Sequence, residues 1–323
     1  MKNSDGRGPL HEPVMVNEVL GQLEPGEAEG EIFLDGTTST GGHALKIARK
    51  LGPDGTLIGI DLDESALEVA KKRLEGVKPE VKLYRANFSD MDLVLEEAGY
   101  SSVDGILLDL GFSSYQLENP SRGFSFQSDG PLDMRMNNEA ETTAEEVVNN
   151  YPFEELKEVI LRYGEEKWAD GIAREIVRSR EESRITTTGD LVSVIERALP
   201  SGEKGRRRIH PATKTFQGLR IEVNNELANL EDGLATAFNC LNRGGILTVI
   251  SYHSLEDRRV KQFFNHREKD CICPPDFPVC RCDKEKEVEV TAKGLTPTEK
   301  EIKENPRSRS AKLRAGRKLT AKS

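Results

Sequence analysis

The 323-residue sequence lacks any run of about 18 apolar residues, which a membrane-spanning helix requires. Its first residues, MKNSDGRGPLHEP, also lack the apolar core of a secretory signal peptide. Internal repeats and low-complexity segments are missing too. The 36% apolar content is enough to bury a sizeable core in one large or two modest domains, which argues against disorder throughout. We therefore expect a soluble, cytoplasmic protein with no membrane partner.

Basic residues are outnumbered by acidic ones, 46 to 56. The resulting formal net charge of −10 argues against a general polyanion binder. The distribution is uneven, however. Residues 305–323 contain seven Lys or Arg and no acid, whereas residues 1–304 contain 39 basic and 56 acidic groups. Such a cationic tail is either a solvated surface or loose end, or a contact to phosphates. Composition alone favours the first interpretation.

The first third of the chain alternates short β-branched runs with helical patterns, which is typical of parallel βαβ units with helices on both sheet faces. The expected strands are Ile32–Asp35, Thr56–Asp61, Val81–Ala86 and Val103–Leu110, and a fifth follows much later at Gly245–Ser251. The expected crossover helices are His43–Leu51, Glu64–Leu74 and Asp92–Ala98.

The segment between the fourth and fifth strands has helical periodicity and little that resembles a strand. Thr143 with Glu146, and Thr187 with Asp190, have the spacing of helix-start capping boxes. We therefore expect a helical domain at residues 115–210, inserted into an α/β domain made of residues 1–114 and 211–323.

Carboxylates mark the ends of the first two expected strands. The first leads into the turn Asp35-Gly-Thr-Thr-Ser-Thr-Gly-Gly-His43, and the second ends at Asp61, 26 residues after Asp35. At the carboxyl edge of a parallel sheet, small residues let the backbone approach a ligand, and a helix N-terminus supplies free N–H donors. Since a carboxylate at Asp61 can accept hydrogen bonds from both ribose hydroxyls, the pattern indicates an adenosine-containing ligand.

Phosphate-binding motifs are missing, and this narrows the choice among adenosine-containing ligands. The turn does not match G-x-G-x-x-G, and the sequence contains no G-x-x-x-x-G-K-[ST]. An adenosine ligand without phosphates, held by acids, fits S-adenosylmethionine, whose amino and sulfonium groups are positive. Asp35 is suitably placed to hold the cationic methionine end.

The next two strand ends carry further candidates. Phe88 follows the third strand, where its ring can cover the adenine or belong to the core, and Asp109 ends the fourth strand. Three acids at successive strand ends on one sheet edge are hard to explain by solubility alone.

The chain resembles the ribosomal RNA small subunit methyltransferase H family, which methylates N4 of a cytosine in the decoding region of 16S rRNA. The resemblance runs nearly end to end. It is carried by His11-Glu-Pro-Val14, the first turn, Asp109-Leu-Gly-Phe-Ser-Ser-Tyr-Gln116, Arg122-Gly-Phe-Ser-Phe126, Asp129-Gly-Pro-Leu-Asp-Met-Arg135, Tyr163-Gly-Glu-Glu166, His210-Pro-Ala-Thr-Lys-Thr-Phe-Gln217, Leu219-Arg-Ile-Glu-Val-Asn224, Ser251-Tyr-His-Ser-Leu-Glu-Asp-Arg258 and Asn305-Pro-Arg-Ser-Arg-Ser310.

The resemblance implies an α/β fold of class I S-adenosylmethionine-dependent methyltransferases: Rossmann-like, with a mostly parallel seven-stranded sheet and an inserted α-helical domain. It implies 16S rRNA in the small ribosomal subunit as the partner. The cofactor-binding residues that it implies are Gly41, Gly42, His43, Asp61, Phe88, Asp109 and Gln116. One departure is Ser39, where relatives usually carry Gly; if that position needs positive φ, Ser costs on the order of 1 kcal/mol.

The exocyclic amine of cytosine is a poor nucleophile, so an acceptor for its N–H should help, and Asp109 is the candidate catalytic residue. A base in structured RNA must be extruded to reach such a site. Phe112 or Tyr115 can then stack on the extruded base, or these residues can instead belong to the core. A polar stripe on the helix after His210 either faces RNA or is a solvated edge, with basic residues nearby as phosphate contacts. The stripe is Gln217, Arg220 and Asn224, and the basic residues are Lys214, Arg206, Arg207 and Arg208.

Two further features have competing interpretations. His253, just beyond the fifth strand, is a general base or part of a structural segment in which Ser254 with Asp257 begins the next helix. Cys271, Cys273, Cys280 and Cys282 form C-x-C-x6-C-x-C, with Cys240 left over. Four thiolates can enclose Zn²⁺ tetrahedrally, although C-x-C is less diagnostic than C-x2-C, and reduced thiols in a surface loop are the alternative.

The preferred hypothesis is therefore a methyltransferase acting on cytosine N4 of small-subunit rRNA. A ribosome-assembly or RNA-binding protein that kept the fold but lost turnover is the rival, and Ser39 is its best support. The same chemistry on a small molecule or a protein is a third possibility, which the basic tail and the long insert make less attractive.

Overall fold

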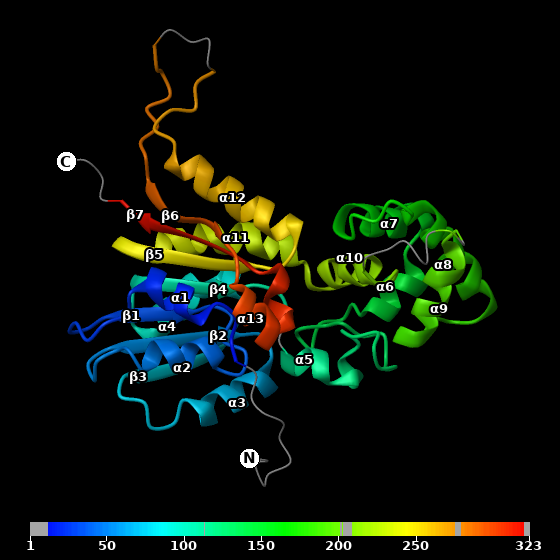
Figure 1. The fold of residues 1–323 in the computed structure, drawn as a ribbon, viewed down its shortest axis with the longest axis horizontal. Helices are drawn as coiled ribbons and strands as arrows, with labels where there is room; N and C mark the ends of the chain where they lie inside the picture. The colour runs from blue at the N-terminus through cyan, green and yellow to red at the C-terminus, as the bar shows by residue number, and fades with distance from the viewer. Residues whose placement is uncertain (1–11, 113, 201, 203–208, 275–278, 320–323) are drawn as a thin grey trace. The chain divides into compact units, whose positions relative to one another are not determined.

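The computed structural model describes residues 12–112, 114–200, 202, 209–274 and 279–319 (Figure 1). The chain forms two compact units. The sheet unit comprises residues 1–111 and 229–323, and the helical unit comprises residues 112–228. The helical unit therefore extends beyond residue 210, where the sequence predicts the insert to end.

The sheet unit is built on seven strands in the order β3-β2-β1-β4-β5-β7-β6. Strands β1 to β5 run parallel, and β7 is antiparallel to both β5 and β6. The strands are β1 (Ile32–Asp35), β2 (Thr56–Asp61), β3 (Glu80–Arg85), β4 (Val103–Asp109), β5 (Leu241–Ser251), β6 (Val288–Leu295) and β7 (Lys312–Lys318). This confirms the mostly parallel seven-stranded sheet.

Helices cover both faces of the sheet. Successive residues of a strand point to opposite sides, so each strand contributes apolar side chains to both faces. On one face, Leu34, Ile58 and Leu108 pack with α4 (Met91–Ala98), α11 (Glu226–Cys240) and α12 (Ser254–Glu268). On the other face, Phe33, Leu57 and Leu107 pack with α1 (Val16–Leu23), α2 (Gly42–Ala48) and α3 (Glu64–Arg73). A short helix, α13 (Glu299–Glu304), precedes β7.

Strand β7 corrects the expectation that the cationic C-terminal segment is a solvated or loose end. It lies between β5 and β6, with Leu313 opposite Ile250, and its Leu313 and Ala315 are buried. Its charges are also used internally, since Arg314 and Lys312 contact Asp257 at 2.8 and 3.2 Å. Residues 320–323 lie outside the described residues.

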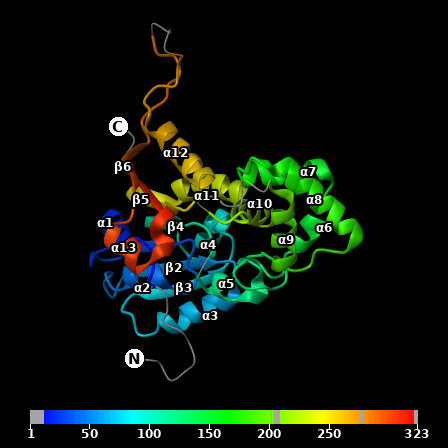
Figure 2. The ribbon, with the colours of Figure 1, turned by 45° about the vertical axis from the view of Figure 1, so that its right-hand side comes forward.

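The helical unit contains its own core, to which α6 (Ala144–Asn150), α7 (Phe153–Glu158), α8 (Ala169–Glu182), α9 (Thr188–Ala198) and α10 (Thr213–Asn224) contribute. Figure 2 shows these helices together. Phe216 and Leu219 of α10 belong to this core, which is why the unit reaches past residue 210. The unit also contains α5 (Ser114–Glu118) and a π-helical turn, η3 (Val159–Tyr163). The capping box of Thr187 with Asp190 is present.

The parallel strands finish at one edge of the sheet, and three of them finish on acids: β1 at Asp35, β2 at Asp61 and β4 at Asp109. Strand β5 ends beside β4 at Ser251. Among the described residues, the helices all fall short of the length and apolarity needed to span a bilayer.

Candidate cofactor and active site

Asp35 is the deepest of the three edge carboxylates. Its side chain is 2% exposed, and its Oδ1 accepts a hydrogen bond from the Thr37 N–H at 3.2 Å. Burial raises the pKa of Asp35 to about 7; His43 and the Thr37 N–H oppose this rise, and the charges of Asp109 and Asp61 add to it. A carboxylate that is buried beside two others favours a cationic ligand, because a positive charge would stabilise its ionised form.

Asp61 anchors the turn after β1. Its two oxygens accept hydrogen bonds of 2.8 Å from the Ser39 and Asp63 N–H groups. Burial raises the pKa of Asp61 to about 6, and these backbone donors oppose the rise. Each carboxylate oxygen has a second lone pair, so the group retains capacity to accept ribose hydroxyls.

The turn itself has two residues in the left-handed region, Ser39 at φ 47° and Gly41 at φ 77°. Ser39 therefore does occupy a position that favours glycine, at a cost on the order of 1 kcal/mol. A Cβ on Gly41 would lie 3.2 Å from Ala70 of α3, and one on Gly42 would lie 3.3 Å from Pro13. Backbone conformation therefore favours glycine at position 41, and packing against Ala70 and Pro13 leaves little room for a Cβ at either position.

Asp109 is held from two sides. Its Oδ1 accepts a hydrogen bond of 2.8 Å from the Tyr252 hydroxyl, and its N–H donates to Thr37 Oγ1 at 2.7 Å. On the other side, His43 Nε2 lies 3.5 Å from Asp109 Oδ2. The Asp109 side chain remains 22% exposed, so these contacts leave part of the carboxylate accessible.

Tyr252 is a site residue that the sequence interpretation missed. Burial, and then the charge and hydrogen bond of Asp109, raise the pKa of Tyr252 well above its usual range, so its hydroxyl stays protonated and donates. The signal was present, because Tyr252 directly follows β5 at the same sheet edge as Asp109.

His43 lies in the first turn of α2 and is only 6% exposed. Within the described residues its Nε2 has no hydrogen-bond partner. A buried ring nitrogen without a hydrogen-bond partner, beside Asp109 and Asp35, fits a site that is completed by a polar ligand.

Phe88 begins a short 3-10 turn after β3 and is partly buried. Its ring lies so close to α11 that a Cβ on Gly233 would meet Cδ2 and Cε2 at 2.4 Å. The ring therefore rests on α11 and is only partly exposed.

The helical unit holds the other predicted residues. Gln116 of α5 is buried in this unit. Phe112 stacks on Phe124 at 5.7 Å between ring centroids, and Arg220 lies 4.7 Å over the Phe112 ring. Phe112 thus has the contacts of a core residue. The Tyr115 side chain and Arg206, Arg207 and Arg208 lie outside the described residues.

The polar stripe on α10 is used within the helical unit. Gln217 donates to the Tyr163 carbonyl at 2.9 Å, and Arg220 forms two hydrogen bonds to Glu226 at 2.8 and 2.9 Å. Asn224 pairs with the backbone of Met134 and Met136. Lys214 donates to the Glu165 carbonyl at 2.6 Å. These contacts favour a structural role for the stripe over an RNA-facing one.

His253 is the N-cap of α12 and Ser254 is its first residue, which corrects the expectation that Ser254 caps this helix. Its ring Nδ1 accepts from the Glu256 N–H at 3.4 Å, and Glu256 in turn accepts from the His253 N–H at 3.2 Å. Glu256 also contacts His253 Nε2 at 3.1 Å. This reciprocal capping box accounts for the histidine without general-base chemistry.

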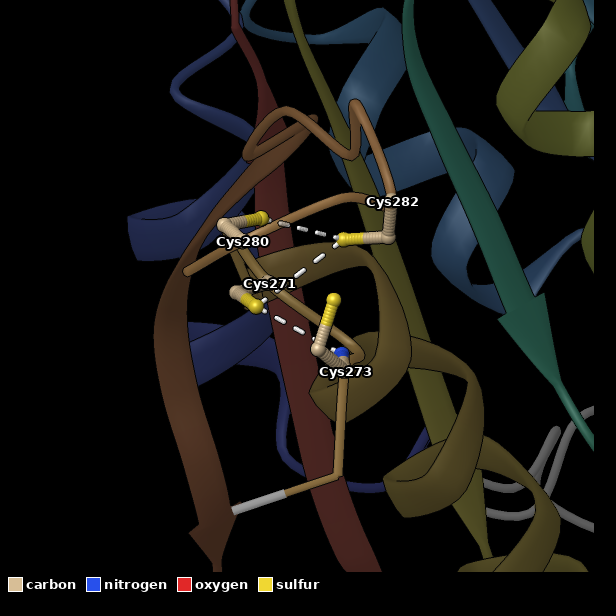
Figure 3. A group of neighbouring side chains, drawn as sticks. All are labelled: Cys271, Cys273, Cys280 and Cys282. Atoms are coloured by element: carbon tan, nitrogen blue, oxygen red, sulfur yellow. Dashed lines mark hydrogen bonds between the residues drawn. The ribbon is translucent and has the colours of Figure 1, made fainter. Parts of the chain in front are cut away.

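The four cysteines between α12 and β6 lie together, with Sγ atoms all within 4.8 Å of one another (Figure 3). Cys240 is separate, because it is buried in the core of the sheet unit.

The strand order with a reversed β7, together with acids at the ends of β1, β2 and β4, defines a class I methyltransferase that uses S-adenosylmethionine. The sequence matches the MraW methylase family over residues 9–319, and the chain belongs to that family.

Curated relatives extend over nearly the whole chain. It is 49% identical to "Ribosomal RNA small subunit methyltransferase H" of Syntrophotalea carbinolica over 96% of this chain and 98% of the relative. It is 46% identical to the protein of the same name from Syntrophus aciditrophicus, over 98% of this chain and 99% of the relative. Among solved structures, an rRNA methylase from Streptococcus thermophilus has a TM-score of 0.42 at 10% identity, over 96% of this chain and 99% of that one.

Proposed function

We propose that this protein transfers the methyl group of S-adenosylmethionine to the exocyclic N4 of a cytosine in the decoding region of 16S rRNA, in the small ribosomal subunit. The observation that carries the rRNA substrate is the 49% identity to a small-subunit rRNA methyltransferase over almost the entire length of both chains. The N4 position and the decoding region follow from the family resemblance.

The donor would be held by Gly41, Gly42, His43, Asp61, Phe88, Asp109 and Gln116. When bound, S-adenosylmethionine supplies a methyl group on a positively charged sulfur, so the leaving group needs no metal. Asp61 retains lone pairs for ribose hydroxyls, and the buried Asp35 provides negative charge for the cationic methionine end.

Asp109 is the proposed catalytic residue. A cytosine amine must lose a proton as it gains a methyl group. The partly exposed Asp109 carboxylate, whose Oδ1 accepts a hydrogen bond from Tyr252, would accept that proton. Tyr252 would act as a positioning residue that fixes the carboxylate plane. Alignment of the acceptor amine with the donor contributes the rest of the rate, since a near-attack geometry removes much of the barrier.

The rival function, RNA binding without turnover, depended on Ser39. Ser39 adopts the positive φ of the turn and its N–H donates to Asp61, so the turn keeps its anchor. This supports a binding-competent site.

The test uses labelled S-adenosylmethionine with small subunits from cells that lack this protein. We expect label to enter 16S rRNA, and mass mapping to place it on N4 of one decoding-region cytosine. Binding of the particle without incorporated label would favour the rival function. Naked 16S rRNA in a parallel reaction shows whether the assembled particle is required.

Asp109→Asn tests the proton acceptor. We expect methyl transfer to fall about 10²-fold or more, while donor affinity falls much less. Tyr252→Phe is the matched comparison, with a smaller loss because the carboxylate remains. Near-normal affinity and rate in Asp109→Asn would remove Asp109 from the mechanism.

A further inference from the structure

The segment between α12 and β6 projects away from the sheet in its described residues, 269–274 and 279–287 (Figure 1). None of its described residues is buried or belongs to a hydrophobic core cluster. Two of its apolar side chains are well exposed, Ile272 at 49% and Val279 at 67%. Apolar burial therefore does not hold this segment in a defined shape.

Polar contacts close only the base of the segment. The Glu287 N–H donates to the Arg267 carbonyl at 2.9 Å, and the Glu287 carboxylate pairs with both Arg267 and Lys284. Farther out, among the described residues from 271 to 282, the hydrogen bonds that join the two arms involve the cysteine sulfurs.

The four sulfur atoms converge on one point from both arms of the segment (Figure 3). Cys280 and Cys282 Sγ lie 3.5 Å apart, and Cys271 and Cys282 Sγ lie 3.9 Å apart. Four sulfurs at about 2.3 Å from a tetrahedral Zn²⁺ would be about 3.8 Å from one another. A disulfide instead requires about 2.05 Å. The observed spacing is therefore that of a metal ligand set.

Backbone amides surround the sulfurs. The Ile272 N–H points to Cys282 Sγ, the Cys273 N–H to Cys271 Sγ and the Arg281 N–H to Cys273 Sγ, each at 3.4 Å. Donors of this kind offset the negative charge of thiolates and orient them toward a metal.

We propose that Cys271, Cys273, Cys280 and Cys282 bind one Zn²⁺ as a closed four-thiolate site that fixes this projecting segment. Binding forms four Zn–S bonds and releases the thiol protons to solvent. With all four positions occupied by protein, the metal offers no place for a substrate, so the site is structural.

The site lies at the end of the sheet unit opposite the carboxylates. Val288, where the segment returns, pairs with Lys318, and the neighbouring Arg317 pairs with Ile246, the register partner of Gly105 near the start of β4. The acids stand at the other ends of the parallel strands. Loss of the metal should therefore leave donor binding intact, which separates this proposal from the proposed function.

The experiment uses the full-length protein, purified from zinc-supplemented cells and exposed to mild chelation before metal analysis. We expect about one zinc per chain, and Co²⁺ added to the metal-free protein should give the visible absorption of a tetrahedral thiolate site. Cys271→Ser and Cys282→Ser should lose both signals. Cys240→Ala, which removes the fifth cysteine, should keep both.

Donor binding by each variant serves as the folding check, so a variant that merely unfolds is recognised. Protease cleavage within residues 269–287 should accelerate in the metal-free protein while the rest of the chain resists. Zinc below about 0.2 equivalents, with no cobalt absorption from the folded protein, would overturn the proposal. A denatured thiol count reduced by two or four would show disulfides instead.

Discussion

At the scale of single residues, Asp35 makes the stability of the ligand-free protein dependent on pH. Burial raises its pKa to about 7, above the value of about 3.8 in the unfolded chain, so the folded state binds more protons between these values. The stabilising contribution is therefore complete below pH 4 and is lost as the pH rises through 7. Asp61, with a pKa raised to about 6, acts in the same direction.

We predict that Asp35→Asn flattens this dependence. The wild-type free energy of unfolding should fall from pH 4 to pH 8, with Asp35 contributing on the order of 4 kcal/mol, and the variant should lose most of that fall. Urea titrations at several pH values measure it. Asp54→Asn, at an exposed carboxyl in the turn before β2, is the matched control and should preserve the wild-type slope. An unchanged slope in Asp35→Asn would contradict the assignment.

Individual residues of the candidate site could be predicted from the sequence, but contacts between residues far apart in the chain could not. Asp35, Asp61 and Asp109 end strands, and strand ends are visible in a hydrophobic pattern. The contact of Tyr252 with Asp109 could not be predicted, because it joins residues 143 positions apart and depends on the pairing of β4 with β5.

At the scale of elements, His253 at the start of α12 has two candidate roles, helix capping and general-base catalysis, which predict different effects of mutation. As an N-cap it satisfies the Glu256 N–H, and removal of a cap typically costs about 1 kcal/mol. We predict that His253→Ala lowers the free energy of unfolding by about that amount, whereas His253→Asn, which can cap, restores it. Chemical denaturation of the three proteins measures this.

Activity supplies the second half of that test. If capping is the whole role, His253→Asn should transfer methyl groups within a factor of about three of wild type. A general base would be worth about 10²-fold or more, so a loss of that size in a stable His253→Asn variant would assign catalysis to the histidine.

The elements that periodicity predicted and those that it missed differ in composition. Strands β1, β2 and β4 are mostly apolar runs, whereas β3 mixes charged with apolar residues; the sequence predicts all four to within one residue at either end. Strand β7, KLRAGRK, has four cationic residues out of seven, and β6 alternates buried with exposed residues in an acid-rich context. Both are strands because backbone pairing and a few small or apolar side chains suffice beside β5, a tertiary effect that local propensity does not record.

At the scale of the whole molecule, two separate cores suggest two folding units. The helical unit buries an apolar cluster drawn from α6 to α10. We predict that residues 112–228 expressed alone are helical and melt cooperatively in circular dichroism. The same fragment with Ile160→Asp, which introduces a charge at a fully buried position, should lose the transition. A wild-type fragment without a cooperative transition would show that the unit depends on the rest of the chain.

The pairing of β4 with β5 has a kinetic consequence. Asp109 and Ile250 are register partners, so this contact closes a loop of about 140 residues, and long closures are slow as well as entropically unfavourable. Early collapse of the helical unit would shorten the flexible chain within that loop before the two strands meet. We infer that substitutions which weaken the helical core should delay completion of the sheet during refolding, even though they lie in none of its strands.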